Sequence, residues 1–435
     1  MNKETVYKNF VKYVSLNVLG VICFSCYIFA DTFFVARALG SNGLAALNLS
    51  IWVFSILQGL ALMIGIGGAT QYTISKNKGE AANSIFTYSL SIGILAAIIF
   101  VFIGYFLASP LVKILGADAT IYPLTKVYMQ TILYFSPVFI INTILIAFIR
   151  NDNNPKLAMA GMVTGSFSNI VLDYIFLFPM SMGMFGAALA TGLSLILGSL
   201  VLALHFLKKS NQLKLLKYKI RIKEIGNTFL LGSSAMIGEL SFAISLITFN
   251  LVILRIEGNI GVAAYGIVAN IAIIAISIFI GVAQGIQPLL SKGHGSGSYV
   301  LIIKPLKYAI ISVVLLAFIM YFVTYFNLIA IVSAFNNEAN STLSLLATTG
   351  LQIYFIGLIF AGVNIVTAAF FSAIANAKTG LIISLLRSCV LIIPMVIFLS
   401  TMLKMNGVWL SFVFTEIIVC VLSIIFLYRK LRQYH

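Results

Sequence analysis

Charged residues are scarce in this 435-residue chain: they make up 9% of it, whereas hydrophobic residues make up 61% and the mean hydropathy is +1.09. A soluble domain needs roughly 25% charged residues to cover its surface. So few charges exclude a soluble globular protein, and most of the outer surface must face lipid. The net charge of +16 does not indicate nucleic acid binding, because the basic residues lie in short clusters between long apolar runs.

Cysteine is also scarce, and the four cysteines (Cys23, Cys26, Cys389 and Cys420) all lie within apolar runs. No disulfide framework is predicted, and a zinc site would need a second pair beside the C-x-x-C of Cys23 and Cys26. The glycine-rich stretch 293–297 is no phosphate-binding loop, because no strand precedes it and no Lys-Ser/Thr follows it. Nothing here predicts an ATPase or another enzyme, so any transport must draw its energy from an ion gradient.

Long apolar runs make up much of the chain. A transmembrane helix needs about 20 mostly apolar residues, and these runs are too long and too uniformly apolar for barrel strands. The first run exceeds the roughly 7–15 residues of a signal-peptide core, so we interpret it as a retained span. Pro137 and Pro394 are expected to kink the spans that contain them. We predict an all-α membrane protein with twelve spans, over 13–37, 44–74, 84–108, 127–149, 157–178, 184–207, 228–256, 261–291, 299–326, 343–375, 379–401 and 405–428.

Positive charge is unequally divided between the two sides that these spans define. One side receives 21 of the 27 lysines and arginines, including the basic segment 208–227. Cytoplasmic loops carry such an excess. We therefore expect both termini and this segment to be cytoplasmic.

The two halves of the chain repeat one another at offsets of about half its length. Because each repeat holds six spans, both halves point the same way and should be related by a pseudo-twofold axis along the membrane normal. We predict an N-lobe at 1–207, an inter-lobe loop at 208–227 and a C-lobe at 228–435. The matching segments are Gly40–Ala46 with Gly258–Ala264, Ser75–Gly79 with Ser291–Gly295, Asn142–Lys156 with Asn364–Lys378, and Met184–Leu189 with Met405–Leu410.

Two acids, Asp31 and Asp173, lie at similar depth in the outer half of the predicted N-lobe, where an unpaired charge is costly. Tyr27 precedes Asp31 by four residues and Asn169 precedes Asp173 by four, so each pair shares a helix face. Such an oxygen cluster can hold a proton, because burial and a like charge disfavour the ionised form, or it can coordinate a small hard cation. The alternative is two unrelated acids, each capped by a local hydroxyl group.

Three more ionisable residues, Glu239, Arg387 and Glu416, lie within spans of the predicted C-lobe. Arg387 and Glu416 can form a structural ion pair or a functional one, and the sequence leaves both open. Glu239 has no obvious partner. We interpret it as a substrate-binding or proton-binding residue, with a water-solvated cavity residue as the alternative.

Several segments, including those that hold Asp31 and Asp173, resemble the MATE (multidrug and toxic compound extrusion) family, in its prokaryotic multidrug-efflux branch. The resemblance covers nearly the whole chain, and the Asn-x-x-x-Asp of Asn169 and Asp173 is its most specific element. The matching segments are Tyr27–Val35, Leu39–Gly40, Gly43–Ala46, Asn153–Lys156, Asn169–Asp173, Gly186–Thr191, Ala264–Gly266 and Gly285–Leu289.

The resemblance implies twelve helices in two lobes, a bacterial cytoplasmic membrane location, and export of cationic compounds in exchange for protons or sodium ions. The family's coupling site carries over to Asp31, Asn169, Asp173 and Thr191, with Tyr27 beside Asp31. We expect no cofactor other than a sodium ion at Asp31, Asn169 and Asp173, and we expect a functional monomer. Members often have a proline early in helix 1, where this chain has Ser15-Leu16-Asn17, so bending at a proline is not expected there.

Two other functions are alternatives to cation-coupled efflux. A flippase for a lipid-linked saccharide would need several basic residues in its central cavity to hold a diphosphate, whereas here the membrane interior is rich in acids. A sensor or assembly scaffold without transport is disfavoured by the tandem repeat and by the acids within the spans.

Overall fold

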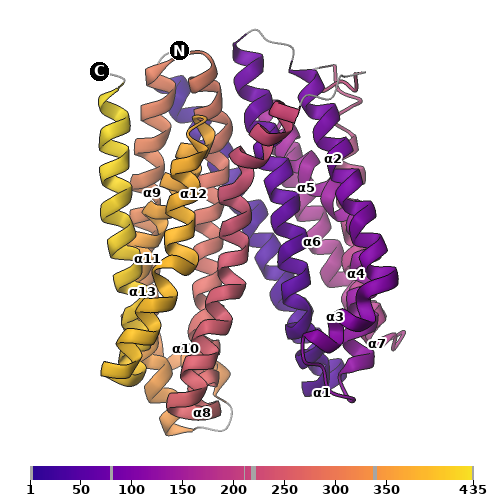
Figure 1. Ribbon diagram of the computed structural model, residues 1–435, viewed down its shortest axis with the longest axis vertical. Helices are drawn as coiled ribbons and strands as arrows, with labels where there is room; N and C mark the ends of the chain where they lie inside the picture. The colour runs from indigo at the N-terminus through magenta and orange to yellow at the C-terminus, as the bar shows by residue number, and fades with distance from the viewer. Residues whose placement is uncertain (1–2, 79–81, 210, 217–221, 337–339, 434–435) are drawn as a thin grey trace. The chain divides into compact units, whose positions relative to one another are not determined.

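The computed structural model is helical throughout, with no strand, across the residues that it describes: 3–78, 82–209, 211–216, 222–336 and 340–433. Gly79, the end of the matched segment Ser75–Gly79, lies outside these residues. The basic segment 208–227 also has three residues outside them: Lys217, Lys219 and Arg221. The predicted all-α membrane fold is confirmed (Figure 1). The helices are α1 Lys3–Asn77, α2 Asn83–Phe102, η1 Ile103–Leu107, α3 Ala108–Ile114, α4 Tyr122–Tyr134, α5 Ser136–Asn151, α6 Pro155–Leu177, α7 Gly183–Ala203, α8 Ile222–Gly295, α9 Tyr299–Phe326, α10 Leu328–Phe335, α11 Ser341–Ala373, α12 Ala377–Leu385, η2 Leu386–Val390 and α13 Ile392–Arg432.

Long helices in this fold carry more than one span each. Eight described helical stretches are long and apolar enough to cross a membrane, or nine when α4 and α5 count as one span bent by 52°. Backbone breaks at Gly40 in α1, Gly258 in α8 and Lys404 in α13 divide three of these stretches in two. The described residues therefore hold the twelve predicted spans.

Both predicted prolines lie at helix irregularities. Pro137 is in the first turn of α5, directly after the bend at Phe135. Pro394 has no N–H to donate to the carbonyl of Val390, and Val390 is the last residue of the π-helical turn η2. The kink expected at Pro137 thus coincides with the 52° bend, whereas Pro394 follows a π-helical turn and its kink stays a prediction.

Backbone turns repeat between the two halves at equivalent positions. A positive φ is costly for residues with a Cβ atom, so its recurrence at matched positions is not a local accident. It shows that the sequence repeat is also a repeat of backbone geometry. The pairs are Gly40 (65°) with Gly258 (61°), Asn153 (61°) with Ala375 (60°), and Gly183 (59°) with Lys404 (49°).

Contacts group the chain into two compact units. The first unit is Ser15–Glu239, and the second combines the residues up to Val14 with those from Leu240 onward. In the first unit α6 packs along α7 and α2 packs against α5; in the second α11 packs against α13 and α9. The lobe boundaries predicted from the repeat stay predictions, because contact grouping is a different criterion from sequence repetition.

Two glycines at equivalent positions allow a second helix to approach closely. A Cβ atom on Gly67 of α1 would overlap the backbone carbonyl of Thr228 in α8, within the first unit. A Cβ atom on Gly285 of α8 would lie 2.8 Å from the Cα atom of Val14 in α1, within the second unit. The first turns of α8 therefore pack on the second span of α1, and the first turns of α1 pack on the second span of α8.

Candidate functional site

The predicted coupling residues lie together in the first unit, on three helices. Tyr27 and Asp31 are in the first span of α1, Asn169 and Asp173 are one turn apart in α6, and Thr191 is in α7. The packing of α6 along α7 brings Asn169 to Thr191. All five residues are buried, and none is more than 7% exposed.

The carboxyl groups of Asp31 and Asp173 lie close enough to interact with each other. Beside them, Nδ2 of Asn169 donates to Oγ1 of Thr191 at 3.4 Å, and that hydroxyl donates to the carbonyl of Ala187 at 3.2 Å. No described residue donates a hydrogen bond to Oδ1 of Asp31, Oδ1 of Asn169 or either carboxyl oxygen of Asp173. Four buried acceptor atoms therefore lack donors.

This donor shortage determines the chemistry of the site. An ionised carboxylate can only accept hydrogen bonds, and each buried acceptor left without a donor costs about 1–3 kcal/mol, or more when it is charged. Two ionised carboxylates would also repel each other in a medium of low dielectric constant. A proton shared between the carboxyl groups, or a hard cation held by the oxygens, relieves both costs.

A residue that the sequence reasoning missed, Tyr128 of α4, belongs to the same environment. It is buried and interacts electrostatically with Asp31, Asp173 and Tyr27. Tyr128 lies in α4, which packs against α7, the helix of Thr191. No spacing rule in the sequence links a tyrosine in one apolar span to acids in two others, so only the packing could identify it.

The second unit contains the Arg387–Glu416 ion pair. Nε of Arg387 lies 3.0 and 2.9 Å from the two carboxylate oxygens of Glu416, and a terminal nitrogen lies 2.7 Å from Oε1. Asn364 of α11 donates through Nδ2 to Oε2 at 2.7 Å and to the backbone carbonyl of Glu416 at 2.9 Å. Arg387 thus binds the Glu416 carboxylate in a bidentate manner, and Asn364 holds the same carboxylate. This geometry is compatible with a structural ion pair and with a functional one.

The repeat explains the place of this pair and shows where the halves differ. Asn142, the equivalent of Asn364, donates to the carbonyl of Leu195, the equivalent of Glu416, at 3.3 Å. One hydrogen bond thus recurs in both halves, but the acid is present only in the second. Conversely, the repeat aligns Asp31 and Thr191 with two phenylalanines. These are Phe249, which stacks on Tyr265 at 5.1 Å, and Phe412, which stacks on Tyr354 at 4.0 Å.

Glu239 lies at the end of the first unit and is half-buried. It interacts electrostatically with Tyr27 of α1. The structure thus associates Glu239 with the surroundings of the first acid site, whereas Arg387 and Glu416 belong to the other unit. Its predicted substrate or proton role stays a prediction.

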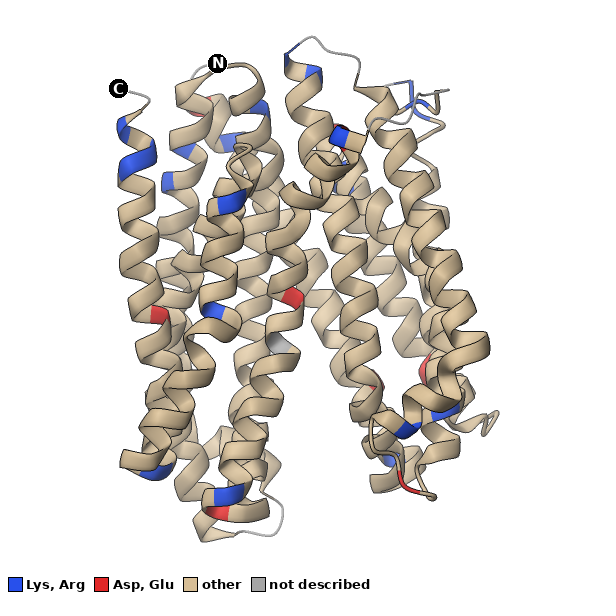
Figure 2. Cartoon of the chain, in the orientation of Figure 1, with Lys and Arg blue, Asp and Glu red and all other residues tan. Residues whose placement is uncertain are grey.

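A second buried acid in the first unit, Asp152, lies in the turn between α5 and α6 and was not singled out from the sequence. Its carboxylate lies 3.0 Å from Nζ of Lys76 and 2.9 Å from Nε2 of His205, and it accepts from the backbone N–H of Gln212 at 2.9 Å. Burial opposes ionisation of Asp152, but hydrogen bonds from His205, Gln212 and Lys76 outweigh it and hold its pKa below the ordinary value. Figure 2 shows that most charged residues lie toward the ends of helices, with few along their middles.

Comparison with known proteins places the chain in a family. A family model described as MatE matches residues 18–175 and 234–398. The chain is 26% identical over 437 residues to the multidrug export protein MepA of Staphylococcus saprophyticus, covering 99% of this chain and 95% of that relative. It is 25% identical over 439 residues to MepA of Staphylococcus aureus strain MRSA252, with the same shares covered.

Solved structures share the fold. One is a multidrug resistance MATE family transporter of the MOP superfamily in an outward-facing conformation, with a TM-score of 0.93 at 21% identity over 99% of this chain and 96% of that one. Another is a MOP superfamily transporter from Pyrococcus furiosus, described as having a binding pocket of reverse polarity, with a TM-score of 0.90 at 21% identity over 98% and 96% of the two chains. Since the family model matches most of both halves, the chain belongs to the MatE family, the multidrug and toxic compound extrusion transporters, and is a multi-pass membrane protein.

Proposed function

We propose that this protein is a secondary active antiporter that exports amphipathic, mainly cationic small molecules in exchange for protons or sodium ions by alternating access. Membership of the MatE family supports the proposal, and so do relatives named as multidrug export proteins. The single observation that carries it is the pair of facing carboxyl groups of Asp31 and Asp173, whose buried oxygens lack donors.

Ion binding at this pair changes the charge between α1 and α6. With a proton or sodium ion bound, the repulsion between Asp31 and Asp173 is relieved and the two helices can stay in contact. Without the ion, the site is negative, which favours a cationic cargo. If each ligand lowers the affinity for the other, the binding of one releases the other, and this coupling gives exchange.

The two candidate ions would use the site differently. A proton would be shared by the carboxyl groups of Asp31 and Asp173, whereas a sodium ion would draw oxygen ligands from Asp31, Asn169 and Asp173. Thr191 positions the Asn169 amide through the hydrogen bond between them. Tyr27 lies beside the acids and contributes to their electrostatic environment. Both ions belong to the proposal.

Dye flux from proteoliposomes tests the proposal. Vesicles loaded with ethidium receive a proton gradient or a sodium gradient, each imposed separately, and efflux is followed by fluorescence. We expect gradient-driven efflux in the wild type and its near-complete loss in Asp31→Asn and in Asp173→Asn, because an amide cannot exchange a proton or supply the charge. Glu257→Gln, which removes an exposed acid, is the matched control and should transport like the wild type.

Unchanged gradient-driven efflux in both site variants would refute the assigned role of these carboxylates. The alternative, a flippase for a lipid-linked saccharide, predicts no ethidium flux under either gradient and transfer of a labelled lipid-linked sugar between leaflets. Within the described spans, Arg387 is neutralised by Glu416, so it offers little free positive charge for a diphosphate.

We further propose a bacterial cytoplasmic membrane location, a functional monomer and cytoplasmic termini, since 21 of the 27 basic residues lie on the side of the termini. Cysteines introduced near residues 8 and 430 should react with a membrane-impermeant maleimide only after cells are permeabilised. Labelling in intact cells would reverse the orientation.

A further inference from the structure

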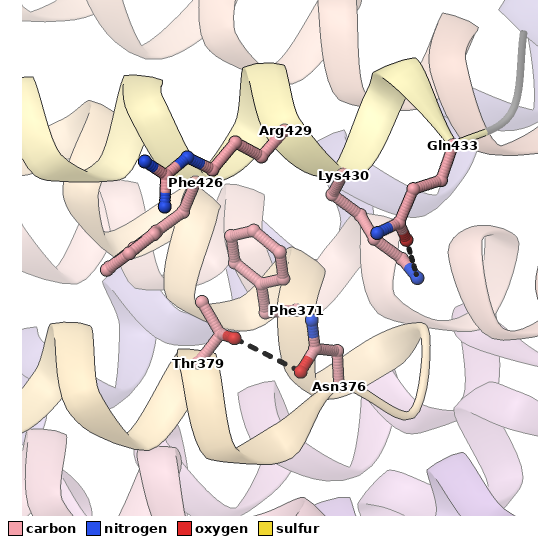
Figure 3. Close-up of a pocket in the computed structure, with 7 residues that line it drawn as sticks. All are labelled: Phe371, Asn376, Thr379, Phe426, Arg429, Lys430 and Gln433. Atoms are coloured by element: carbon pink, nitrogen blue, oxygen red, sulfur yellow. Dashed lines mark hydrogen bonds between the residues drawn. The ribbon is translucent and has the colours of Figure 1, made fainter.

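A pocket of about 150 Å³ opens in the second unit, where the last turns of α13 pass the junction of α11 and α12. It lies outside the acid site and outside the Arg387–Glu416 pair. Figure 3 shows its lining: Phe371, Asn376, Thr379, Phe426, Arg429, Lys430 and Gln433.

The pocket combines cationic and amide groups with an aromatic wall. Arg429 and Lys430 carry two positive charges, and Phe371 and Phe426 supply apolar surface. Oδ1 of Asn376 accepts a hydrogen bond from Thr379 at 3.1 Å, which fixes the amide and leaves its Nδ2 group as a donor. Positive charge, an N–H donor and aromatic surface together suit an anion that carries an apolar tail.

The positive charge of Arg429 lacks a counter-charge among the residues that the structure describes. No described residue forms a hydrogen bond or an ion pair with Arg429. The acids of the second unit, within its described residues, are engaged elsewhere or distant along the chain: Glu4 pairs with Lys8, Glu416 pairs with Arg387, and Glu257 adjoins the break at Gly258. An anion from outside the protein is therefore the available counter-charge.

The position along α13 indicates where that anion comes from. Arg429 and Lys430 directly follow the apolar span predicted at 405–428, so they lie where the helix leaves the hydrocarbon region. Basic pockets at this depth bind lipid head groups, and long basic side chains reach the phosphate level. A free anion in water would gain nothing from the phenylalanine wall, whereas a lipid presents its phosphate and its acyl chain together.

We propose that this pocket is a binding site for a phosphate-bearing anionic lipid. The phosphate contacts Arg429, Lys430 and the amide of Asn376, and the adjoining chain lies along Phe426. The site holds α13 against the junction of α11 and α12, so lipid occupancy stabilises that end of the second unit.

Native mass spectrometry of the full-length protein tests this site. The protein is taken from vesicles of phosphatidylglycerol and phosphatidylcholine in equal parts. The wild type should retain one phosphatidylglycerol under conditions that strip phosphatidylcholine. The double variant Arg429→Gln with Lys430→Gln should lose it, with a roughly thirtyfold fall in affinity for the lipid. A charge-matched control, Lys378→Gln with Arg432→Gln, removes two exposed cations that do not line the pocket and should retain the lipid.

Three outcomes would overturn the proposal. Retention of phosphatidylglycerol by the pocket variant is one, and equal loss from the pocket variant and the control is another, since it indicates diffuse surface attraction. The third comes from titrating inorganic phosphate at constant ionic strength: a rise in melting temperature equal to that given by phosphatidylglycerol would assign the pocket to a free anion. Equal melting temperatures of wild type and pocket variant in phosphatidylcholine alone establish that the variant is folded.

Discussion

Asp152 and Asp173 are both almost fully buried, at 3% and 0% exposed, yet their surroundings are opposite. Asp152 receives hydrogen bonds from Lys76, His205 and the backbone of Gln212, so its charged form is satisfied within the protein. Asp173 receives none from the described residues and faces another carboxyl group. The surroundings of the first acid suit a structural role, whereas those of the second support its proposed role in binding a proton or a cation.

This difference predicts how the stability of the protein against unfolding changes at acidic pH. The pKa of Asp152 is lower in the folded chain than in the unfolded one, where it is about 3.9. Its contribution to stability is therefore fully present above that value and is lost as the pH falls through the folded-state pKa. Asp152→Asn should lower the melting temperature at neutral pH, and the gap to the wild type should shrink below about pH 4. Thermal unfolding in detergent across this range measures the gap.

Asp118 provides the matched control for this measurement. It is an exposed acid whose carboxylate accepts from the backbone N–H groups of Thr120 and Ile121, a role that asparagine can keep. Asp118→Asn should change the melting temperature little at any pH. A gap between Asp152→Asn and the wild type that stays constant down to pH 2.5 would contradict the ion network.

At the scale of helices, the apolar runs predicted the spans but not the short breaks that separate some of them. The runs 13–37 and 44–74 are two helical segments of α1, and the positive φ of Gly40 breaks the helix between them without an intervening loop. The run 127–149 bends by 52° between α4 and α5. The close approach of α8 to α1 at Gly67 was not predictable, because a glycine in an apolar helix does not show which neighbour it admits.

That close approach predicts that alanine substitutions at Gly67 and at Gly238 change the stability of the protein differently. Gly67→Ala places a Cβ atom against the carbonyl of Thr228, and overpacking of this kind typically costs about 1–3 kcal/mol. Gly238→Ala is the control in the same unit, because nothing lies within 4 Å of its added Cβ atom. Alanine favours a helix over glycine by about 1 kcal/mol. The melting temperature should therefore fall for Gly67→Ala and hold or rise for Gly238→Ala.

The reverse ranking of these two variants would show that α8 does not pack on α1 at Gly67. Efflux assays on the same proteins measure whether the ion dependence of transport has changed. Since Gly67 lies outside the acid site, the ion dependence of any residual transport by Gly67→Ala should match the wild type.

At the scale of the whole molecule, the two halves share a backbone and differ in chemistry. Turns and the asparagine hydrogen bonds of Asn142 and Asn364 recur. In the first unit, Asp31 and Asp173 have no counter-charge among the described residues, whereas the second unit neutralises Glu416 with Arg387. We interpret the first unit as the ion-binding half and the ion pair as the support of α12, η2 and α13.

Substitutions in the Arg387–Glu416 ion pair test this assignment of roles to the two units. Glu416→Gln leaves a mostly buried arginine without its partner, which typically costs 3–5 kcal/mol. The double variant Arg387→Met with Glu416→Leu removes both charges and should recover most of that loss, as measured by thermal unfolding. Ion-coupled efflux should persist in the double variant. Its loss, with stability recovered, would assign the pair to transport instead.

Composition and hydropathy by themselves determined the membrane location, the helical class and the twelve spans, because lipid requires every backbone polar group to be bonded within its own helix. The matching segments of the two halves showed the tandem repeat. The sequence also pointed to Asp31 and Asp173, since acids within apolar runs are rare and stand out, and to Asn169 through its spacing of one helical turn from Asp173. Only the tertiary structure placed Tyr128 beside those acids, paired Arg387 with Glu416 and surrounded Asp152 with donors. These contacts join residues far apart in the chain, and helix packing, which local spacing does not encode, decides them.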